Sequence, residues 1–124
     1  MIAGARRSAE SRDFADMQLE MKRGRTGGFR RENTTLAVVA TNARFTKLEA
    51  SKIAQLAQLG VARSIWPANT MSDGDVVIAL SLGERKAPID TVGVAAAEAL
   101  SSAAIRAVKL APTLGGVPGL AGAP

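Results

Sequence analysis

Residues 33–80 read NTTLAVVATNARFTKLEASKIAQLAQLGVARSIWPANTMSDGDVVIAL, a segment in which strand-like and helix-like patterns alternate. Residues 34–42 are short, β-branched and largely apolar, which is typical of a buried strand. A capping box at residues 46–49 predicts the start of a helix, because its Thr and Glu side chains satisfy free backbone amides. Pro67 ends that helix, and residues 76–82 form a second apolar strand.

The flanks of this segment are simpler. A short helix is expected from Asp13, followed by a basic, glycine-rich loop over residues 23–31. After the second strand, a polar loop over residues 83–90 leads to a long helix over residues 91–110, whose alanine-rich face suits close packing on a sheet. Residues 112–124 are rich in Gly, Pro and Ala, and we expect them to be irregular.

The order strand–helix–strand–helix predicts a parallel strand pair. The first long helix is expected to pack through an apolar face that comprises Leu48, Ile53, Leu56 and Ala57. Two strands alone make a sheet that is marginal in water. We therefore expect this chain to complete a larger sheet to which another segment or chain contributes.

The composition restricts the chemistry. The 124 residues include neither cysteine nor histidine. Disulfides, thiol nucleophiles and thiolate metal sites are therefore excluded, as are the commonest general base and the commonest metal ligand. Any hydrolysis must use a hydroxyl, a carboxylate, a lysine or a free α-amine.

The net charge of +5 is concentrated before the first strand. Eight basic and five acidic side chains give residues 1–33 a net charge of +3. The basic stretch over residues 23–31 contains a single aromatic residue, Phe29, and no known nucleic-acid motif, so a solvated linker explains it better than nucleic-acid binding. No apolar run approaches the roughly 20 residues of a membrane span, and no signal peptide is evident. We expect a cytoplasmic protein without a membrane or nucleic-acid partner.

The junction between Asn33 and Thr34 is the first candidate for a catalytic site. If this bond is cut, Thr34 gains a free α-amine, with a pKa near ~7.7–8.0, beside its own hydroxyl. The amine can then act as general base for that hydroxyl, as in threonine nucleophiles at a chain terminus. The alternative is that Thr-Thr simply opens a strand, since β-branched residues favour strands.

A second candidate is Asp73-Gly74-Asp75, which precedes the second strand. Its carboxylates would lie beside the start of the first strand and accept hydrogen bonds from the Thr34 ammonium and hydroxyl. The alternative is a tight turn, for which Asp and Gly are favoured. A metal site is less well supported, because two carboxylates without histidine offer few ligands. We expect neither a metal nor another cofactor.

The same segment resembles the β-chain of the DmpA family of self-processing hydrolases, which includes L-aminopeptidase/D-esterases, β-peptidyl aminopeptidases and nylon-oligomer hydrolases. The resemblance covers about 80 residues from Asn33 and depends on four motifs, which are Asn-Thr-Thr at 33–35, Gly-Val-Ala-Arg at 60–63, Pro-Ala-Asn-Thr at 67–70 and Asp-Gly-Asp at 73–75. It implies that Asn33–Thr34 is the self-cleavage bond, that Thr34 is the nucleophile, and that Asp73 and Asp75 orient it. Many relatives have His at the position of Asn69.

The resemblance also implies an organisation. The fold would be α+β, part of an αββα sandwich. Residues 1–33 would be the end of the α-chain with its linker, residues 34–111 the catalytic portion, and residues 112–124 a tail. An α-chain from the same precursor would supply most of the sheet and the oxyanion donor, the substrate would be a small peptide or amide, and the αβ units would form a homo-oligomer. The competing hypothesis is a non-catalytic fragment or interaction module.

Overall fold

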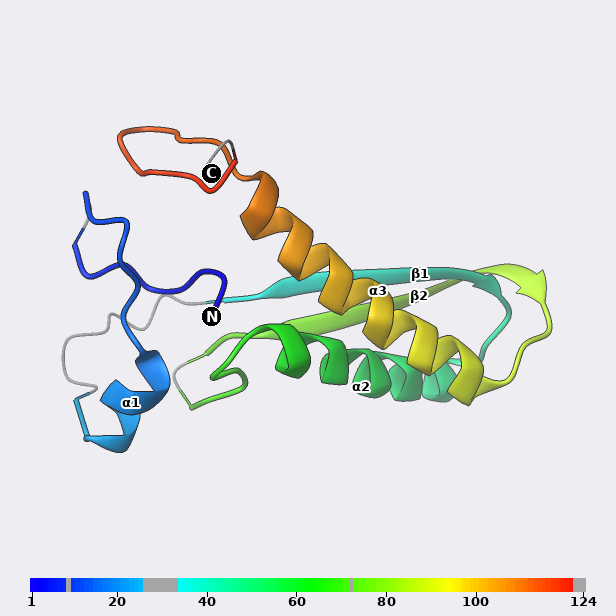
Figure 1. Cartoon of the computed structure of the whole chain (residues 1–124). Coiled ribbons are helices and arrows are strands. Elements are labelled where there is room, and N and C mark those ends of the chain that lie inside the picture. The colour runs from blue at the N-terminus through cyan, green and yellow to red at the C-terminus, as the bar shows by residue number, and fades with distance from the viewer. Residues whose placement is uncertain (9, 26–33, 72, 122–124) are drawn as a thin grey trace.

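The computed structural model describes residues 1–8, 10–25, 34–71 and 73–121. It is an α+β structure in which two strands and two long helices alternate (Figure 1). Its elements are α1 (Met17–Lys22), β1 (Leu36–Ala43), α2 (Lys47–Ser64), β2 (Val76–Arg85) and α3 (Ile89–Leu110). The expected order of strand, helix, strand and helix is therefore confirmed.

The two strands form a parallel sheet, as their order predicts. Their register pairs Leu36 with Val76 and continues regularly to the pairing of Thr41 with Ser81. Parallel neighbours need a long crossover connection, and α2 lies within it. β2 extends past the expected end of the strand into the expected polar loop. The reason is that the Arg85 carbonyl accepts a hydrogen bond of 2.8 Å from the Arg44 amide.

The capping box at the start of α2 is confirmed. The Thr46 hydroxyl accepts a hydrogen bond of 3.3 Å from the Glu49 amide, and the Glu49 carboxylate accepts one of 2.7 Å from the Thr46 amide. The hydrogen bond from the Thr46 amide is the main reason that the pKa of Glu49 is lowered from its ordinary value of 4.5, and the Thr46 hydroxyl, which donates to the same carboxylate at 2.8 Å, lowers it further. The helix ends at Ser64, before an extended Ile65 and close to Pro67, as expected.

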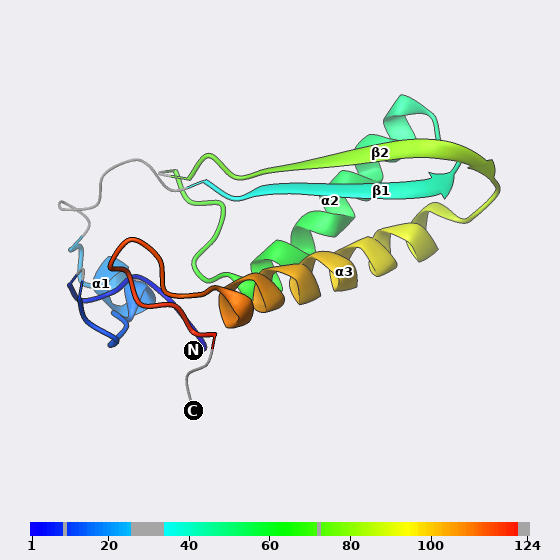
Figure 2. The same cartoon turned by 90° about the horizontal axis from the view of Figure 1, so that it is seen from above.

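The core lies between one face of the sheet and the two long helices, which lie on the same side of it (Figures 1 and 2). Ile53 and Ala57 are buried in it, as expected for α2. Leu48 is instead 82% exposed, so its assignment to the buried face is wrong. Ile53 lies five positions after Leu48, which at 3.6 residues per turn places Leu48 well away from the buried stripe.

The alanine-rich part of α3 packs closely on α2 as well as on the sheet. Ala96 and Ala97 are buried, whereas Ala95 is exposed. A Cβ atom on Gly60 would lie 2.0 Å from the Ala97 carbonyl oxygen, so the two helix backbones meet where a side chain is missing. The alanine-rich face thus packs on the sheet through Ala96, as expected, and it also packs on α2, because small residues on both helices allow them to approach each other.

The opposite face of the sheet is apolar and uncovered by the described part of the chain. Leu36 and Val38 on β1 are 75% and 58% exposed, and Ile78 and Leu82 on β2 are 49% and 70% exposed. Side chains alternate between the two faces of a strand, so these residues share one face. Sheets in which both strands are parallel are normally covered on both faces.

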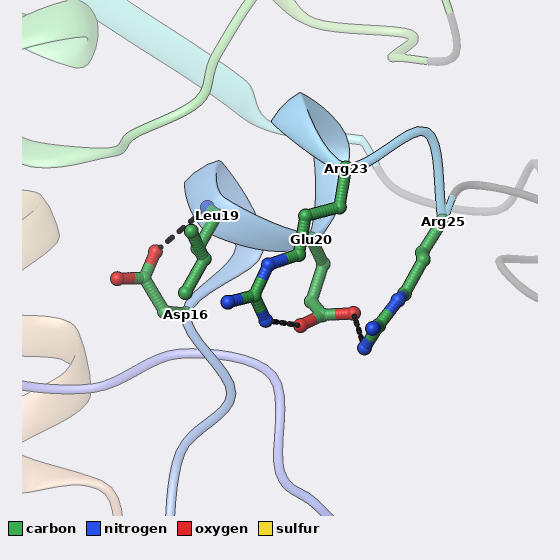
Figure 3. A network of polar contacts seen from close by, with 5 residues as sticks. All are labelled: Asp16, Leu19, Glu20, Arg23 and Arg25. Atoms are coloured by element: carbon green, nitrogen blue, oxygen red, sulfur yellow. Dashed lines mark hydrogen bonds and ion pairs between the residues drawn. The ribbon is translucent and has the colours of Figure 1, made fainter.

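The N-terminal helix is shorter than expected. It begins at Met17 because Asp16 is its N-cap, whose carboxylate accepts a 3.0 Å hydrogen bond from the Leu19 amide (Figure 3). Phe14 lies outside the helix, where the Arg6 guanidinium sits 5.3 Å from its ring centroid. Glu20 pairs with two arginines at 3.6 and 3.4 Å. Exposed ion pairs of this kind contribute roughly 0–1 kcal/mol each.

Among the residues that the structure describes, the helix α3 is long and apolar enough, by length and composition alone, to cross a membrane. The prediction from the sequence concerned uninterrupted apolar runs, and Glu98 and Arg106 interrupt the apolar residues of α3. Its many alanines and valines raise its mean hydropathy. Core helices of soluble proteins meet the same criterion, and α3 packs on α2 through buried Gly93, Ala96 and Ala97.

Candidate functional site

The sequence candidates meet at one end of the sheet. Because Leu36 pairs with Val76, the residues that precede the two strands lie side by side. The Val76 amide donates a hydrogen bond of 2.9 Å to the Thr35 carbonyl, which continues the pairing one residue beyond β1. Thr34, which is exposed, therefore lies next to the Asp73-Gly74-Asp75 turn. Asn33 lies outside the described residues.

The middle of the turn lies directly against the candidate nucleophile. A Cβ atom on Gly74 would lie 2.8 Å from Thr34 Oγ1 and 3.7 Å from Thr34 Cγ2. The Thr34 hydroxyl therefore occupies space that a side chain at position 74 would need.

Asp75 is a half-buried carboxylate that binds two backbone amides. Its Oδ1 accepts a hydrogen bond of 2.7 Å from the Thr35 amide, and its Oδ2 accepts one of 3.2 Å from the Asn69 amide. Both bonds are charge-assisted, which makes them stronger than bonds between neutral groups. Asp75 thus fixes the peptide that follows Thr34. Direct hydrogen bonds from the Thr34 hydroxyl or ammonium to the Asp75 carboxylate stay a prediction.

Asp73 fulfils the role of a turn residue. Its Oδ2 accepts a hydrogen bond of 2.8 Å from the Thr70 amide, and its own amide donates one of 3.1 Å to the Thr70 carbonyl. These two bonds close the loop that precedes β2. The turn interpretation of the sequence and a role beside Thr34 are compatible, because the turn brings this loop to the start of β1.

Asn69 connects this loop to α2. Its backbone has a φ of 56°, a left-handed conformation that asparagine tolerates better than most residues. Its Oδ1 accepts a hydrogen bond of 2.7 Å from Gln58 Nε2. Gln58 was not among the sequence candidates, since nothing in a polar helical residue indicates a partner eleven positions away. A chain of hydrogen bonds thus extends from Gln58 through Asn69 and Asp75 to the Thr35 amide.

Metal ligands and cavities were the other candidate features. In the described part of the chain, no group of three or more acidic side chains gathers as the ligands of a metal ion would. A largely apolar groove of about 500 Å³ runs between the middle of the strands and α3, with Val39, Val92 and Leu100 among its lining. Thr34 does not line it, so we base the site on the hydrogen-bonded cluster rather than on the groove.

Comparison with known proteins places these residues in a family. The family model of Peptidase family S58 matches residues 2–121. An uncharacterized aminopeptidase of Mycobacterium leprae is 38% identical over 101 residues, an alignment that covers 69% of this chain and 28% of that protein. Uncharacterized aminopeptidases of Mycobacterium bovis and Mycobacterium tuberculosis are each 35% identical over 101 residues, covering 69% of this chain and 29% of each protein. The chain thus spans less than a third of the length of these relatives, and it belongs to Peptidase family S58, the family of the DmpA-type hydrolases.

Proposed function

We propose that this chain is the nucleophile-bearing, C-terminal portion of a self-cleaving amidohydrolase that acts on small peptides or amides. The observation that carries the proposal is the position of Thr34, which lies at the start of β1 and against the Asp73-Gly74-Asp75 turn. Membership of a peptidase family, and the aminopeptidase names of the relatives, support the class of reaction.

Self-cleavage would use the Thr34 hydroxyl. Its oxygen attacks the Asn33 carbonyl carbon, and the bond from that carbon to the Thr34 nitrogen breaks as the nitrogen takes up a proton. The resulting ester joins Asn33 to Thr34 Oγ1. Water then hydrolyses this ester, which leaves a carboxylate on Asn33 and a free α-amine with a free hydroxyl on Thr34.

Substrate hydrolysis would repeat the same chemistry with the new terminus. The unprotonated α-amine accepts the hydroxyl proton as Thr34 Oγ1 attacks the substrate amide carbon. The substrate amine leaves with a proton, and water hydrolyses the acyl ester to regenerate Thr34. Because an α-amine has a pKa near ~7.7–8.0, a useful fraction is unprotonated at neutral pH.

The two aspartates would act by orientation. Asp75 holds the Thr35 amide, and so fixes the backbone from which the Thr34 side chain projects. Asp73 closes the loop that carries Gly74 and Asp75. After cleavage, we expect the carboxylates to attract the new ammonium group, since nearby opposite charges favour the charged forms of both groups.

The remainder of the family's fold would come from an α-chain of the same precursor. Three features support this proposal, which are the exposed apolar face of the sheet, the groove beside α3, and the 28% of a relative's length that the chain covers. An αββα sandwich would place a second layer on the exposed face. The α-chain would also supply the oxyanion donor and most of the substrate pocket.

The test is self-cleavage of the complete protein. We expect Thr34→Ala to give one uncut chain, and Thr34→Ser to retain cleavage because a hydroxyl remains. Thr35→Ala is the matched control, since Thr35 acts through its backbone amide and carbonyl, and it should still be cut. Normal cleavage of the Thr34→Ala variant would contradict the proposal. An uncut wild-type protein without amidase activity would favour a non-catalytic module.

A further inference from the structure

We propose that Gly74 is a positioning residue, because the space left by its missing side chain holds the Thr34 hydroxyl in the orientation needed for attack. This inference rests on the assignment of Thr34 as the nucleophile. It adds a requirement for glycine at position 74, which neither aspartate explains. The requirement is steric, because a larger residue would change the rotamer of the Thr34 side chain.

The geometry at this contact is specific. Among the described residues, the three atoms nearest to a Cβ atom on Gly74 would all belong to Thr34, with Oγ1 at 2.8 Å, Cγ2 at 3.7 Å and Cβ at 3.8 Å. Only the distance to Oγ1 is shorter than real Cβ contacts allow. An alanine at this position therefore conflicts with one atom, which is the atom that would attack the carbonyl.

The surrounding backbone is held on both sides of the contact. The Thr35 amide binds Asp75 Oδ1 at 2.7 Å, and the Thr35 carbonyl accepts from the Val76 amide at 2.9 Å. Separating the two strand ends to admit a methyl group would break these bonds. Rotation of the Thr34 side chain relieves the conflict at lower cost, because Thr34 is exposed. Threonine has few staggered positions, so relief moves Oγ1 to a different one.

The backbone conformation does not itself demand glycine at this position. The φ of Gly74 lies outside the left-handed region, whereas Gly115 and Gly116 have φ values of 59° and 80°. Space is therefore the reason for glycine at position 74. At Gly93 the conflict is of another kind, since a Cβ atom there would lie 2.2 Å from Leu56 Cδ1 in the packed contact between α2 and α3.

These differences predict separable effects of two glycine-to-alanine changes. Gly74→Ala should leave folding intact and lower the rate of self-cleavage roughly 10²-fold, the size of effect that a misplacement of about 1 Å can have. Gly93→Ala should lower the thermal midpoint of unfolding, with cleavage reduced only as far as the folded fraction falls.

The experiment measures self-cleavage rates and thermal midpoints of the complete protein for wild type, Gly74→Ala, Thr34→Ser and the Thr34→Ser/Gly74→Ala double variant. Serine lacks the γ-methyl group and can reach a productive rotamer more easily. We therefore expect Gly74→Ala to reduce the rate by a much smaller factor in the serine background than in the threonine background.

Three outcomes would overturn the inference. They are an unchanged cleavage rate in Gly74→Ala, a loss of rate that the fall in thermal midpoint accounts for, and an equal loss in the threonine and serine backgrounds. Thr34→Ala separates this failure from that of the proposed function. If Thr34→Ala is still cut, the nucleophile assignment is wrong, whereas an uncut Thr34→Ala with a fully active Gly74→Ala rejects only the role of Gly74.

Discussion

Replacing Asp75 should weaken both the local structure and the chemistry, by amounts that depend on the replacement. The carboxylate accepts one hydrogen bond from the Thr35 amide and one from the Asn69 amide. A hydrogen bond to a charged group contributes about 1.5–3 kcal/mol, and the half-buried position of Asp75 favours the lower end. Asp75→Asn keeps one acceptor oxygen and should cost about 1.5 kcal/mol, whereas Asp75→Ala loses both bonds and should cost about 3 kcal/mol.

These costs can be measured in the complete protein with Thr34→Ala as background, so that a single uncut chain is compared throughout. Urea unfolding gives the change in free energy, and hydrogen exchange at the Thr35 amide gives the local effect. With Thr34 intact, Asp75→Asn should slow self-cleavage by about 10²–10⁴-fold. Equal costs for Asn and Ala, or unchanged protection of the Thr35 amide in Asp75→Ala, would show that the carboxylate does not hold this peptide.

The 124-residue chain expressed alone should aggregate and lack activity, because its sheet exposes an apolar face, and co-expression with an α-chain of a close relative should restore solubility and amidase activity. A soluble, active monomer would contradict this. Asn69→Gly should keep the left-handed backbone and lose the bond to Gln58, so it should be cut faster than Asn69→Ala, which also strains the backbone. Equal self-cleavage rates for Asn69→Gly and Asn69→Ala would show that the left-handed backbone at position 69 is not required. The lowered pKa of Glu49 means that its capping bonds stabilise the chain above pH 4.5 and are lost as the pH falls through the lowered value. Thr46→Ala, which should cost about 1 kcal/mol at neutral pH, should therefore reduce the acid-dependent loss of stability.

The sequence was sufficient for features that depend on local rules. The capping box at Thr46 and Glu49 follows from residue types three positions apart. The parallel pairing of β1 and β2 follows from the helix between them. The position of Thr34 beside the Asp73–Asp75 turn follows from this pairing, since residues that precede two adjacent parallel strands lie at the same end of the sheet.

Features that depend on tertiary contacts could not be predicted in this way. The close approach of α2 and α3 at Gly60 requires knowledge of where the helices cross. The hydrogen bond from Gln58 to Asn69 joins a helix residue to a loop residue eleven positions further along the chain. The contact between Gly74 and the Thr34 hydroxyl depends on strand register to within one residue, which composition and spacing do not supply.

The intact mass of the complete wild-type protein tests the assignment of Thr34 most directly. Self-cleavage between Asn33 and Thr34 should give two chains, one of which begins at Thr34 and has the mass of the sequence from that residue onward. N-terminal sequencing of this chain should read Thr-Thr-Leu-Ala-Val. A single uncut chain in an active amidase, or a new terminus at any other residue, would contradict the assignment of Thr34 as the nucleophile.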